Sequence, residues 1–381
     1  MPGPLEGITV VDLSRVLAGP FCTLALADLG ARVIKVESGK GDDSRAFGPF
    51  VNGTSAYFAS VNRGKESIVL DLKDAADRRV FEALVAHADV LVENFRPGVM
   101  ARLGLDSDVL TKRHPRLVYA AISGFGQSGP YSDRPAYDLV VQAMGGLMSL
   151  TGHPGQDPVR VGTSIGDITA GLYAAIGITA ALRERERTGR GTVLDIAMLD
   201  CQVAILENAI SRYLSGGSVP GPLGARHPAI APFESYATAD GHVVIAAGND
   251  ALFEKLATAL DDDALRTDPR FWTNDLRNAN VLALKAVIER ITRQQPTRHW
   301  LEVMAKAGIP GGPINTVADV VADPQVKARG MIVSIDDPNA GTLRVAGSPI
   351  RIDGAPPAER LPGAPVLDGQ RAAILAELGL A

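Results

Sequence analysis

The chain has 381 residues, of which 46% are hydrophobic, and its 38 Lys and Arg residues against 43 Asp and Glu residues give a formal net charge of −5. This composition is ample for buried cores, and the length suggests two or three domains at about 150 residues each. Because no overall positive field exists, we expect neither nucleic acid nor an anionic membrane as a partner.

The cysteines and the start of the chain favour a cytoplasmic protein. Cys22 and Cys201 lie far apart in apolar surroundings, which indicates core thiols and no disulfide framework. The chain does not begin with a basic region followed by an apolar one, the pattern of a secretory signal. We expect no segment that is long and apolar enough to span a bilayer. We therefore expect a cytoplasmic location.

Strand and helix patterns alternate in the first third of the chain. Residues 8–13 are β-rich, 21–29 are helical in spacing and 32–37 are again β-rich, which predicts a βαβ unit. Further strands are expected at 67–72, 89–93 and 116–123, and a helix at 74–86. These elements predict an α/β protein with an open, largely parallel, Rossmann-like sheet.

Helical spacing dominates the middle of the chain. Helices are expected at 137–150 and 168–187, followed by a strand at 193–198 and a helix at 199–214. Residues 215–232 are rich in Gly and Pro and have little periodicity, which is typical of a linker.

The remainder predicts a smaller α+β domain and a returning tail. Ala239-Asp240-Gly241 is a hairpin signal, with Gly expected to supply a positive φ. Helical patterns follow at 251–260, 277–292 and 297–307, and the tail holds β-rich runs at 331–335 and 342–345 and a helix at 370–380. The expected domains are a large α/β domain (1–214), a linker (215–232), a small α+β domain (233–316) and a return segment completing the large domain (317–381).

Several chemical motifs can be set aside. Residues 124–129 (GFGQSG) fit the dinucleotide-binding fingerprint, but Pro130 and Pro135 follow where that fingerprint requires a helix. The sequence holds no P-loop, no G-x-S-x-G elbow, and no H-E-x-x-H or paired C-x-x-C motif. Nucleotide hydrolysis, serine-hydrolase chemistry and a metal site are therefore not predicted.

Asp167 is the most informative single residue. It stands immediately before the apolar helical run 168–182, where its carboxylate is expected to face free backbone N–H groups and the positive end of a helix. These interactions favour an ionised acid that is held still and can serve as a nucleophile. The alternative is a helix cap without catalytic function, since Asp is among the preferred N-cap residues.

A series of short sequence motifs, in a fixed order, extends along nearly the whole chain. They are residues 5–14 (LEGITVVDLS), 17–21 (LAGPF), 29–37 (LGARVIKVE), 92–98 (VENFRPG), 124–130 (GFGQSGP), 134–138 (RPAYD), 166–167 (GD), 187–191 (RTGRG) and 308–313 (GIPGGP). In these motifs the chain resembles the class III CoA-transferases, the family that also contains formyl-CoA:oxalate CoA-transferase and α-methylacyl-CoA racemase.

The resemblance implies transfer of CoA from an acyl-CoA donor to a carboxylate acceptor through an aspartyl-CoA thioester on Asp167. By analogy with relatives, the donor is expected to be succinyl-CoA and the acceptor a dicarboxylate. It implies no tightly bound cofactor, with coenzyme A entering as the acyl-CoA substrate. It also implies an interlocked homodimer, with the segments 215–232 and 307–317 as the chain crossings.

By similarity, the CoA-binding residues follow the first strands and the Arg-Pro-Ala-Tyr-Asp block. They are Leu17, Ala18, Leu70, Asp71, Leu72, Lys73, Asn94, Phe95, Arg96, Arg102, Pro135, Ala136, Tyr137 and Asp138. Lys73 and Arg102 are the candidate phosphate partners, although either could be a solvated surface charge. The family has an arginine where this chain has Ser38. One of the side chains that bind the nucleotide part of CoA is therefore absent here or is supplied from elsewhere in the protein.

The reaction also requires oxyanion donors and, for a dicarboxylate, a fixed cation. Small residues let backbone N–H groups approach a carbonyl oxygen, which makes Gly166 and the turn at Gly248 and Asn249 candidate donors. Arg15, Arg45 and Arg226 are candidate cations for the distal carboxylate of the acceptor, and the sequence does not choose among them.

Differences from two branches of the family argue against placing the chain in either branch. The formyl-CoA:oxalate branch has a glutamine at Leu17 and a longer glycine run in the second loop. The racemase branch has a histidine where this chain has Tyr137, and a tyrosine side chain, with a reference pKa of about 10, is a poor base near neutral pH. Tyr137 either lies beside the thioester or packs at a helix start. A racemase or epimerase and a non-catalytic acyl-CoA-binding protein remain the alternatives.

Overall fold

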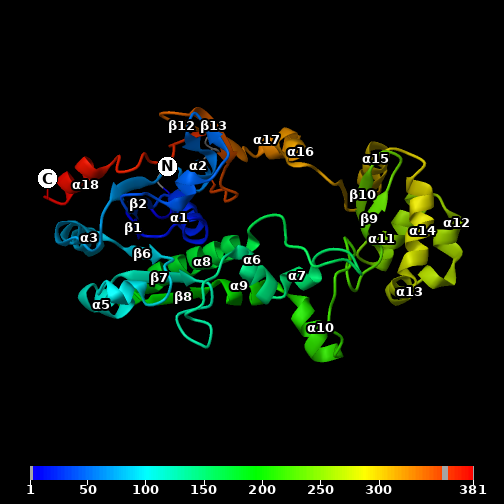
Figure 1. Ribbon diagram of the computed structural model, residues 1–381. Coiled ribbons are helices and arrows are strands. Elements are labelled where there is room, and N and C mark those ends of the chain that lie inside the picture. Colours follow the sequence, from blue (N-terminus) through cyan, green and yellow to red (C-terminus); the bar gives the residue numbers. More distant parts are fainter. Residues whose placement is uncertain (1–2, 354–358, 381) are drawn as a thin grey trace. The chain divides into compact units, whose positions relative to one another are not determined.

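The computed structural model describes residues 3–353 and 359–380 (Figure 1). The chain divides into two compact units. The first contains residues 1–149, 159–220 and 324–381, and the second contains residues 150–158 and 221–323.

A six-stranded parallel sheet forms the centre of the first unit, in the order β5-β2-β1-β6-β7-β8. Its strands are β1 (Thr9–Asp12), β2 (Arg32–Glu37), β5 (Glu66–Val69), β6 (Val90–Glu93), β7 (Val118–Ser123) and β8 (Val193–Ala197). Each corresponds to a strand expected from the sequence. The predicted α/β class with an open parallel sheet is therefore confirmed.

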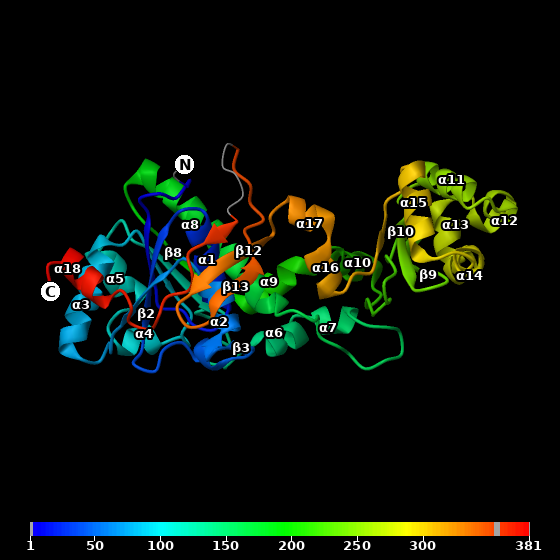
Figure 2. The same cartoon turned by 90° about the horizontal axis from the view of Figure 1, so that it is seen from above.

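Helices cover both faces of this sheet, so its central strands are apolar on both sides. Alternate residues enter different cores: Val10 packs with α1 (Ala18–Asp28) and α8 (Ile165–Thr188), whereas Val11 packs with α3 (Ala75–His87) and α5 (Ser107–Arg113). Figure 2 shows α3, α5 and α18 (Arg371–Glu377) on the side of the sheet opposite α1.

Smaller elements complete the first unit. They are η1 (Asp43–Ala46), β3 (Phe50–Val51), β4 (Thr54–Ser55), α2 (Ala56–Asn62), α4 (Val99–Arg102), α6 (Asp138–Met144), α9 (Met198–Ile205), α10 (Asn208–Gly216), α17 (Pro324–Ala328), β12 (Ile332–Asp337), β13 (Gly341–Ala346) and β14 (Arg360–Leu361). The β12–β14 sheet packs on α2, where Phe58 lies in one buried cluster with Val333 and Ile335.

The second unit is a smaller α+β structure, as predicted. Its antiparallel sheet consists of β9 (Phe233–Ala237), β10 (His242–Ala246) and β11 (Gly311–Pro313). Its helices are α11 (Asp250–Ala259), α12 (Asp263–Thr267), η2 (Pro269–Phe271), α13 (Asn274–Ala279), α14 (Val281–Thr292), α15 (Thr297–Ala307) and α16 (Val317–Ala322). The β9–β10 hairpin forms where expected, but the φ of Gly241 lies outside the left-handed region, so its predicted positive φ is wrong.

Several helix predictions needed correction. The helices expected at 199–214 and 277–292 are each divided, the first into α9 and α10 and the second into α13 and α14. The helix expected at 137–150 is divided into α6 and α7 (Leu147–Leu150), because Gly146 between them has a φ of 83°. The long helix starts three residues earlier than expected, at Ile165, with Ser164 as its N-cap. Asp167 therefore lies inside the first turn of α8 and is not its N-cap, the alternative that the local sequence had left open.

Helix α8 also revises the expectation about membrane-length segments. Its 24 residues include a window with a mean hydropathy of 1.5, which meets the length and composition of a membrane span. Half of that window is buried within the protein. Because α8 packs against α1 and α9 through buried Ala170, Ala174 and Ile178, it has the character of a core helix.

Candidate active site

A pocket lies at the carboxyl ends of β1, β6 and β7. Strand order reverses between β1 and β6: β2 and β5 lie beyond β1, and β7 and β8 lie beyond β6. Open α/β sheets bind ligands at such a switch point, because the loops leaving the two strands diverge there. The pocket measures about 180 Å³ and is lined by Arg15, Val16, Leu17, Ala18, Asp43, Asn94, Phe95, Arg96, Pro97, Ile122, Ser123, Gly124, Arg134, Pro135, Ala136, Tyr137, Asp167 and Met198.

The pocket brings together about half of the site residues expected from the sequence. Asp167 from α8 faces it together with the expected CoA-binding residues Leu17, Ala18, Asn94, Phe95, Arg96, Pro135, Ala136 and Tyr137. Arg15, a candidate for acceptor binding, lines the same pocket.

Other expected CoA-binding residues lie outside this pocket. Leu70 is buried in the core on the far side of the sheet, and the Asp71 carboxylate accepts the backbone N–H of Lys73 in the turn before α3. Leu72 is partly buried against the same core, whereas Lys73 and Arg102 are exposed. These residues follow β5 and β6, so they lie at the same edge of the sheet as the pocket without lining it.

Asp138 does not line the pocket but fixes the start of α8. Its carboxylate accepts the backbone N–H of Gly166 at 2.8 Å and the side-chain amide of Gln142 at 2.7 Å. The Arg160 guanidinium lies 3.7 Å from it. Because the N–H of Gly166 is already engaged, Gly166 is not a free oxyanion donor in this structure, which corrects the expectation from sequence.

The remaining candidates divide between the two units. Gly248, Asn249 and Arg226 belong to the second unit, where the Asn249 side chain caps α11 by accepting the N–H of Leu252 at 2.9 Å. Arg45 belongs to the first unit, but its guanidinium donates to both Glu37 carboxylate oxygens, at 2.8 and 2.6 Å, and to the Pro365 carbonyl at 3.2 Å. Arg45 is thus committed to the protein itself.

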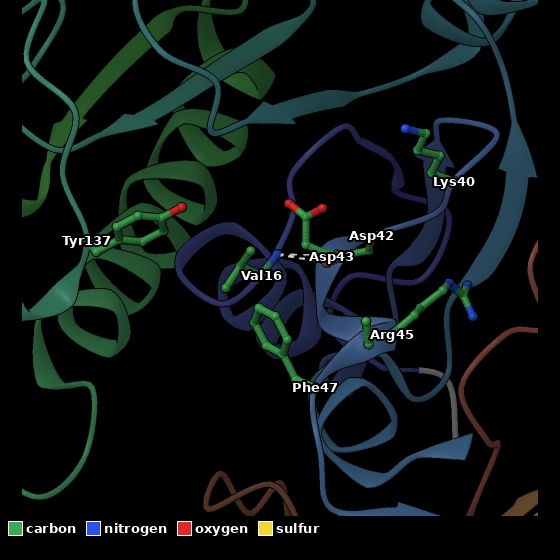
Figure 3. A pocket seen from close by; sticks show the side chains of 8 residues that line it. Val16, Lys40, Asp42, Asp43, Arg45, Phe47 and Tyr137 are labelled. Atoms are coloured by element: carbon green, nitrogen blue, oxygen red, sulfur yellow. Dashed lines mark hydrogen bonds between the residues drawn. The ribbon is translucent and has the colours of Figure 1, made fainter. Parts of the chain in front are cut away.

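A second hollow of about 570 Å³ adjoins the pocket and shares Val16, Asp43 and Tyr137 with it. In Figure 3, Tyr137, Val16 and Phe47 lie on one side, and Lys40 and Arg45 lie on the other. The sequence analysis missed Val16, Lys40, Asp43 and Phe47. The polar and Gly-rich run 38–43 directly after the second strand is a signal that could have identified Lys40 and Asp43.

Burial governs the acidity of Asp167. Loss of solvent around the carboxyl, reinforced by the negative charge of Asp138, raises its pKa from 3.8 to about 7. The sequence had suggested that the helix start would favour the ionised form, and desolvation outweighs that effect. Burial and the charge of Asp167 also raise the pKa of Tyr57, a neighbour that the sequence analysis missed.

The raised pKa predicts a pH profile. If the ionised Asp167 is the attacking group, kcat/KM for acyl-CoA should be lost as pH falls through about 7 and should level off above it. Asp138→Asn removes the neighbouring negative charge while keeping an oxygen for the Gly166 N–H, so the midpoint should move to lower pH. Rate measurements from about pH 5 to pH 9 check both expectations. A flat wild-type profile would contradict the assignment.

The fold and pocket define a class: an α/β protein with a partly buried carboxylic acid on a helix, facing a cavity at the switch point of a parallel sheet. The model of CoA-transferase family III matches residues 5–371. The chain therefore belongs to this family and is a CoA-transferase, as the sequence resemblance predicted.

Similarity to individual relatives spans essentially the full chain. The chain is 48% identical over 377 residues to acetyl-CoA:oxalate CoA-transferase of Acetobacter aceti, covering 98% of this chain and 96% of the relative. It is 42% identical over 383 residues to succinate–glutarate CoA-transferase of Agrobacterium fabrum, with 98% and 96% covered. The crystal structure of a CAIB/BAIF family protein from Brucella suis matches with a TM-score of 0.87 at 45% identity, covering 99% of this chain and 100% of that one.

Proposed function

We propose that this CoA-transferase moves CoA from an acyl-CoA donor to a dicarboxylate acceptor through an aspartyl-CoA thioester on Asp167. The observation that supports this most is the position of the Asp167 carboxyl in the same pocket as Leu17, Ala18 and Asn94 at the sheet's switch point. The carboxyl is the same functional group as the donor and acceptor acids. Exchanging a thioester among the three is nearly thermoneutral and needs no ATP.

The first half of the reaction loads CoA onto the enzyme. An Asp167 carboxylate oxygen attacks the donor thioester carbonyl, and CoA leaves as a thiolate, which gives a mixed anhydride between Asp167 and the donor acyl group. The thiolate then attacks the Asp167 carbonyl and expels the donor carboxylate. The products of this half are an aspartyl-CoA thioester and the free donor acid.

The second half repeats these steps with the acceptor. The acceptor carboxylate attacks the aspartyl carbonyl and displaces the CoA thiolate, giving a mixed anhydride with the acceptor. The thiolate attacks the acceptor carbonyl, which releases acceptor-CoA and restores the Asp167 carboxylate. No oxidant, reductant or proton donor is consumed over the cycle.

The start of α1 is the proposed oxyanion site. Each carbonyl attack creates a tetrahedral oxyanion that requires aimed hydrogen-bond donors. The first N–H groups of a helix have no partner within it, and no side chain caps α1 at Leu17. Leu17 and Ala18 line the pocket with Asp167, which supports their N–H groups as the oxyanion donors in place of the engaged N–H of Gly166.

Arg15 is the proposed partner for the distal carboxylate of the acceptor. It lines the Asp167 pocket, and its ion pair with Asp43 is long, at 3.4 Å, with both side chains more than half exposed. Such a pair contributes little stability, so an incoming carboxylate can replace Asp43 at low cost. Relatives named for oxalate and glutarate support a dicarboxylate acceptor.

An acceptor screen tests this function. With succinyl-CoA and acetyl-CoA as donors, we expect oxalate, succinate, glutarate or malate to accept CoA, and monocarboxylates of equal length to accept it far less well. Arg15→Gln should raise KM for the dicarboxylate much more than KM for acyl-CoA. No dicarboxylate turnover, together with deuterium entering the α-carbon of branched acyl-CoA from heavy water, would favour the racemase alternative.

We also propose a homodimer. Helices α8 and α10 carry large apolar residues that are exposed to solvent, among them Leu172, Ile176 and Leu214, whose exposed fractions are 45%, 62% and 76%. Leu172 and Ile176 lie four residues apart and so share one face of α8, and adjoining exposed apolar side chains are typical of protein interfaces. A dimer is expected to persist on dilution in sedimentation velocity experiments down to nanomolar protein. A monomer at that concentration would contradict the proposal.

A further inference from the structure

Val16 adopts an unusual backbone conformation at the lip of the pocket. Its φ is 68°, in the left-handed region, which is unfavourable for a residue with a β-carbon and especially for a β-branched one. Val16 lines both the Asp167 pocket and the adjoining hollow. A strained residue persists at such a place only when its surroundings hold it there.

A buried ion pair holds Val16. The Asp42 carboxylate accepts the Val16 backbone N–H at 3.1 and 3.2 Å, the contact drawn as a dashed line in Figure 3. Lys35 Nζ lies 2.8 Å from that carboxylate, and both side chains are buried. Lys35 also donates to the Ser14 carbonyl at 2.7 Å, so one ammonium group joins Asp42 to the segment that contains Val16.

Asn94 fixes the same segment from the neighbouring strand. Its side-chain oxygen accepts the Arg15 N–H at 2.9 Å, and its amide donates to the Arg15 carbonyl at 2.8 Å. The backbone from Ser14 to Val16 is therefore held by side chains from the loops after β2 and β6. The direction in which the chain enters α1 is set by this short segment.

We propose that Asp42, supported by Lys35, is a positioning residue that keeps Val16 in the left-handed conformation and so aims the start of α1 at the substrate thioester. This inference rests on the proposed role of the Asp167 pocket as the acyl-CoA site. Asp42 acts through Val16 and does not itself touch the reacting atoms. The loop after the second strand thereby controls the geometry of the loop after the first.

A double-mutant cycle separates positioning from simple stabilisation. Breaking a buried ion pair destabilises a protein wherever it lies, so loss of activity in Asp42→Ala alone would not be diagnostic. Val16→Gly removes the penalty on the left-handed conformation, because glycine adopts it without strain. The positioning role predicts that Asp42→Ala costs much less activity when Val16→Gly is already present.

Quantitatively, we expect Asp42→Ala to lower kcat/KM for acyl-CoA by about tenfold or more in the otherwise wild-type enzyme, mostly through kcat. In the Val16→Gly background the same change should cost about threefold or less. Asp42→Asn keeps an oxygen acceptor for the Val16 N–H and should fall between wild type and Asp42→Ala. Equal losses in both backgrounds would overturn the proposal.

Asp28→Ala provides the matched control. It breaks another ion pair of the same unit, between the partly buried Asp28 and the buried Arg63, at the end of α1 remote from the pocket. Its Tm should fall, whereas its kcat/KM should stay within about twofold and show no coupling to Val16→Gly. The thioester mechanism is tested separately by replacing Asp167, so an additive cycle overturns the positioning role of Asp42 even where Asp167 proves essential.

Discussion

Asp167→Asn is expected to lower CoA transfer by at least about a thousandfold, because an amide cannot accept and release the coenzyme as a carboxylate does. Steady-state transfer between an acyl-CoA and a dicarboxylate measures the effect. The neighbouring acid supplies the control: Asp138→Asn should retain readily measurable turnover, since Asp138 binds the Gly166 N–H and does not line the Asp167 pocket. Turnover of Asp167→Asn within about tenfold of wild type, with deamidation excluded by mass, would contradict the mechanism.

The Asp167→Asn variant should fold as wild type does, and at alkaline pH it should be more stable than wild type. The folded-state pKa of Asp167 is raised from 3.8 to about 7, so the folded protein binds this proton more tightly than the unfolded chain. Wild type therefore loses about 1.4 kcal/mol of unfolding free energy per pH unit through this group as pH rises from about 4 to about 7. The amide does not ionise, so the variant should exceed wild type in denaturant unfolding at about pH 8.

Gly171→Val is expected to damage both stability and activity, because it separates the two helices that bring the reacting groups together. A Cβ atom at Gly171 of α8 would lie 2.7 Å from the Ala18 carbonyl oxygen and 3.2 Å from the Cys22 nitrogen of α1. These are backbone atoms and cannot yield without moving α1. Overpacking of this kind costs about 1–3 kcal/mol, and displacement of Ala18 relative to Asp167 should lower kcat by about 10²-fold.

Gly177→Ala tests whether that effect depends on the position in the helix. It lies on the same helix, but its Cβ would meet only the flexible Leu194 side chain at 3.3 Å. Thermal unfolding and kcat should change little for Gly177→Ala and greatly for Gly171→Val. Similar behaviour of the two variants would contradict the proposed importance of the α1–α8 contact.

The sheet could be predicted because its strands carry their own signal. The apolar runs that became β1, β2, β6 and β7 are buried on both faces, and helical spacing separates them. Once the sheet is placed, the carboxyl ends of its strands bring the segments at Leu17, Asn94 and Ala136 to one pocket. Family resemblance added the role of Asp167, which its local sequence alone left open between nucleophile and cap.

What the sequence did not reveal depends on three-dimensional surroundings. The local pattern at Asp167 indicated an easily ionised acid, but burial of the first turn of α8 and the nearby Asp138 oppose ionisation. Arg45 has the chemistry of an acceptor-binding residue, yet Glu37 and the Pro365 carbonyl occupy its guanidinium. The left-handed φ of Val16 could not be predicted from the residues next to it, because the carboxylate that accepts its backbone N–H belongs to Asp42, 26 residues away in the chain.

Mass spectrometry of the loaded enzyme tests the central claim most directly. The protein is mixed with acyl-CoA without acceptor, quenched, and digested, and a parallel sample is treated with hydroxylamine before quenching. We predict CoA bound through a thioester to the peptide that contains Asp167, conversion of that side chain to a hydroxamate by hydroxylamine, and neither product in Asp167→Asn. An enzyme that turns over normally while Asp167 carries neither CoA nor hydroxamate would contradict the account.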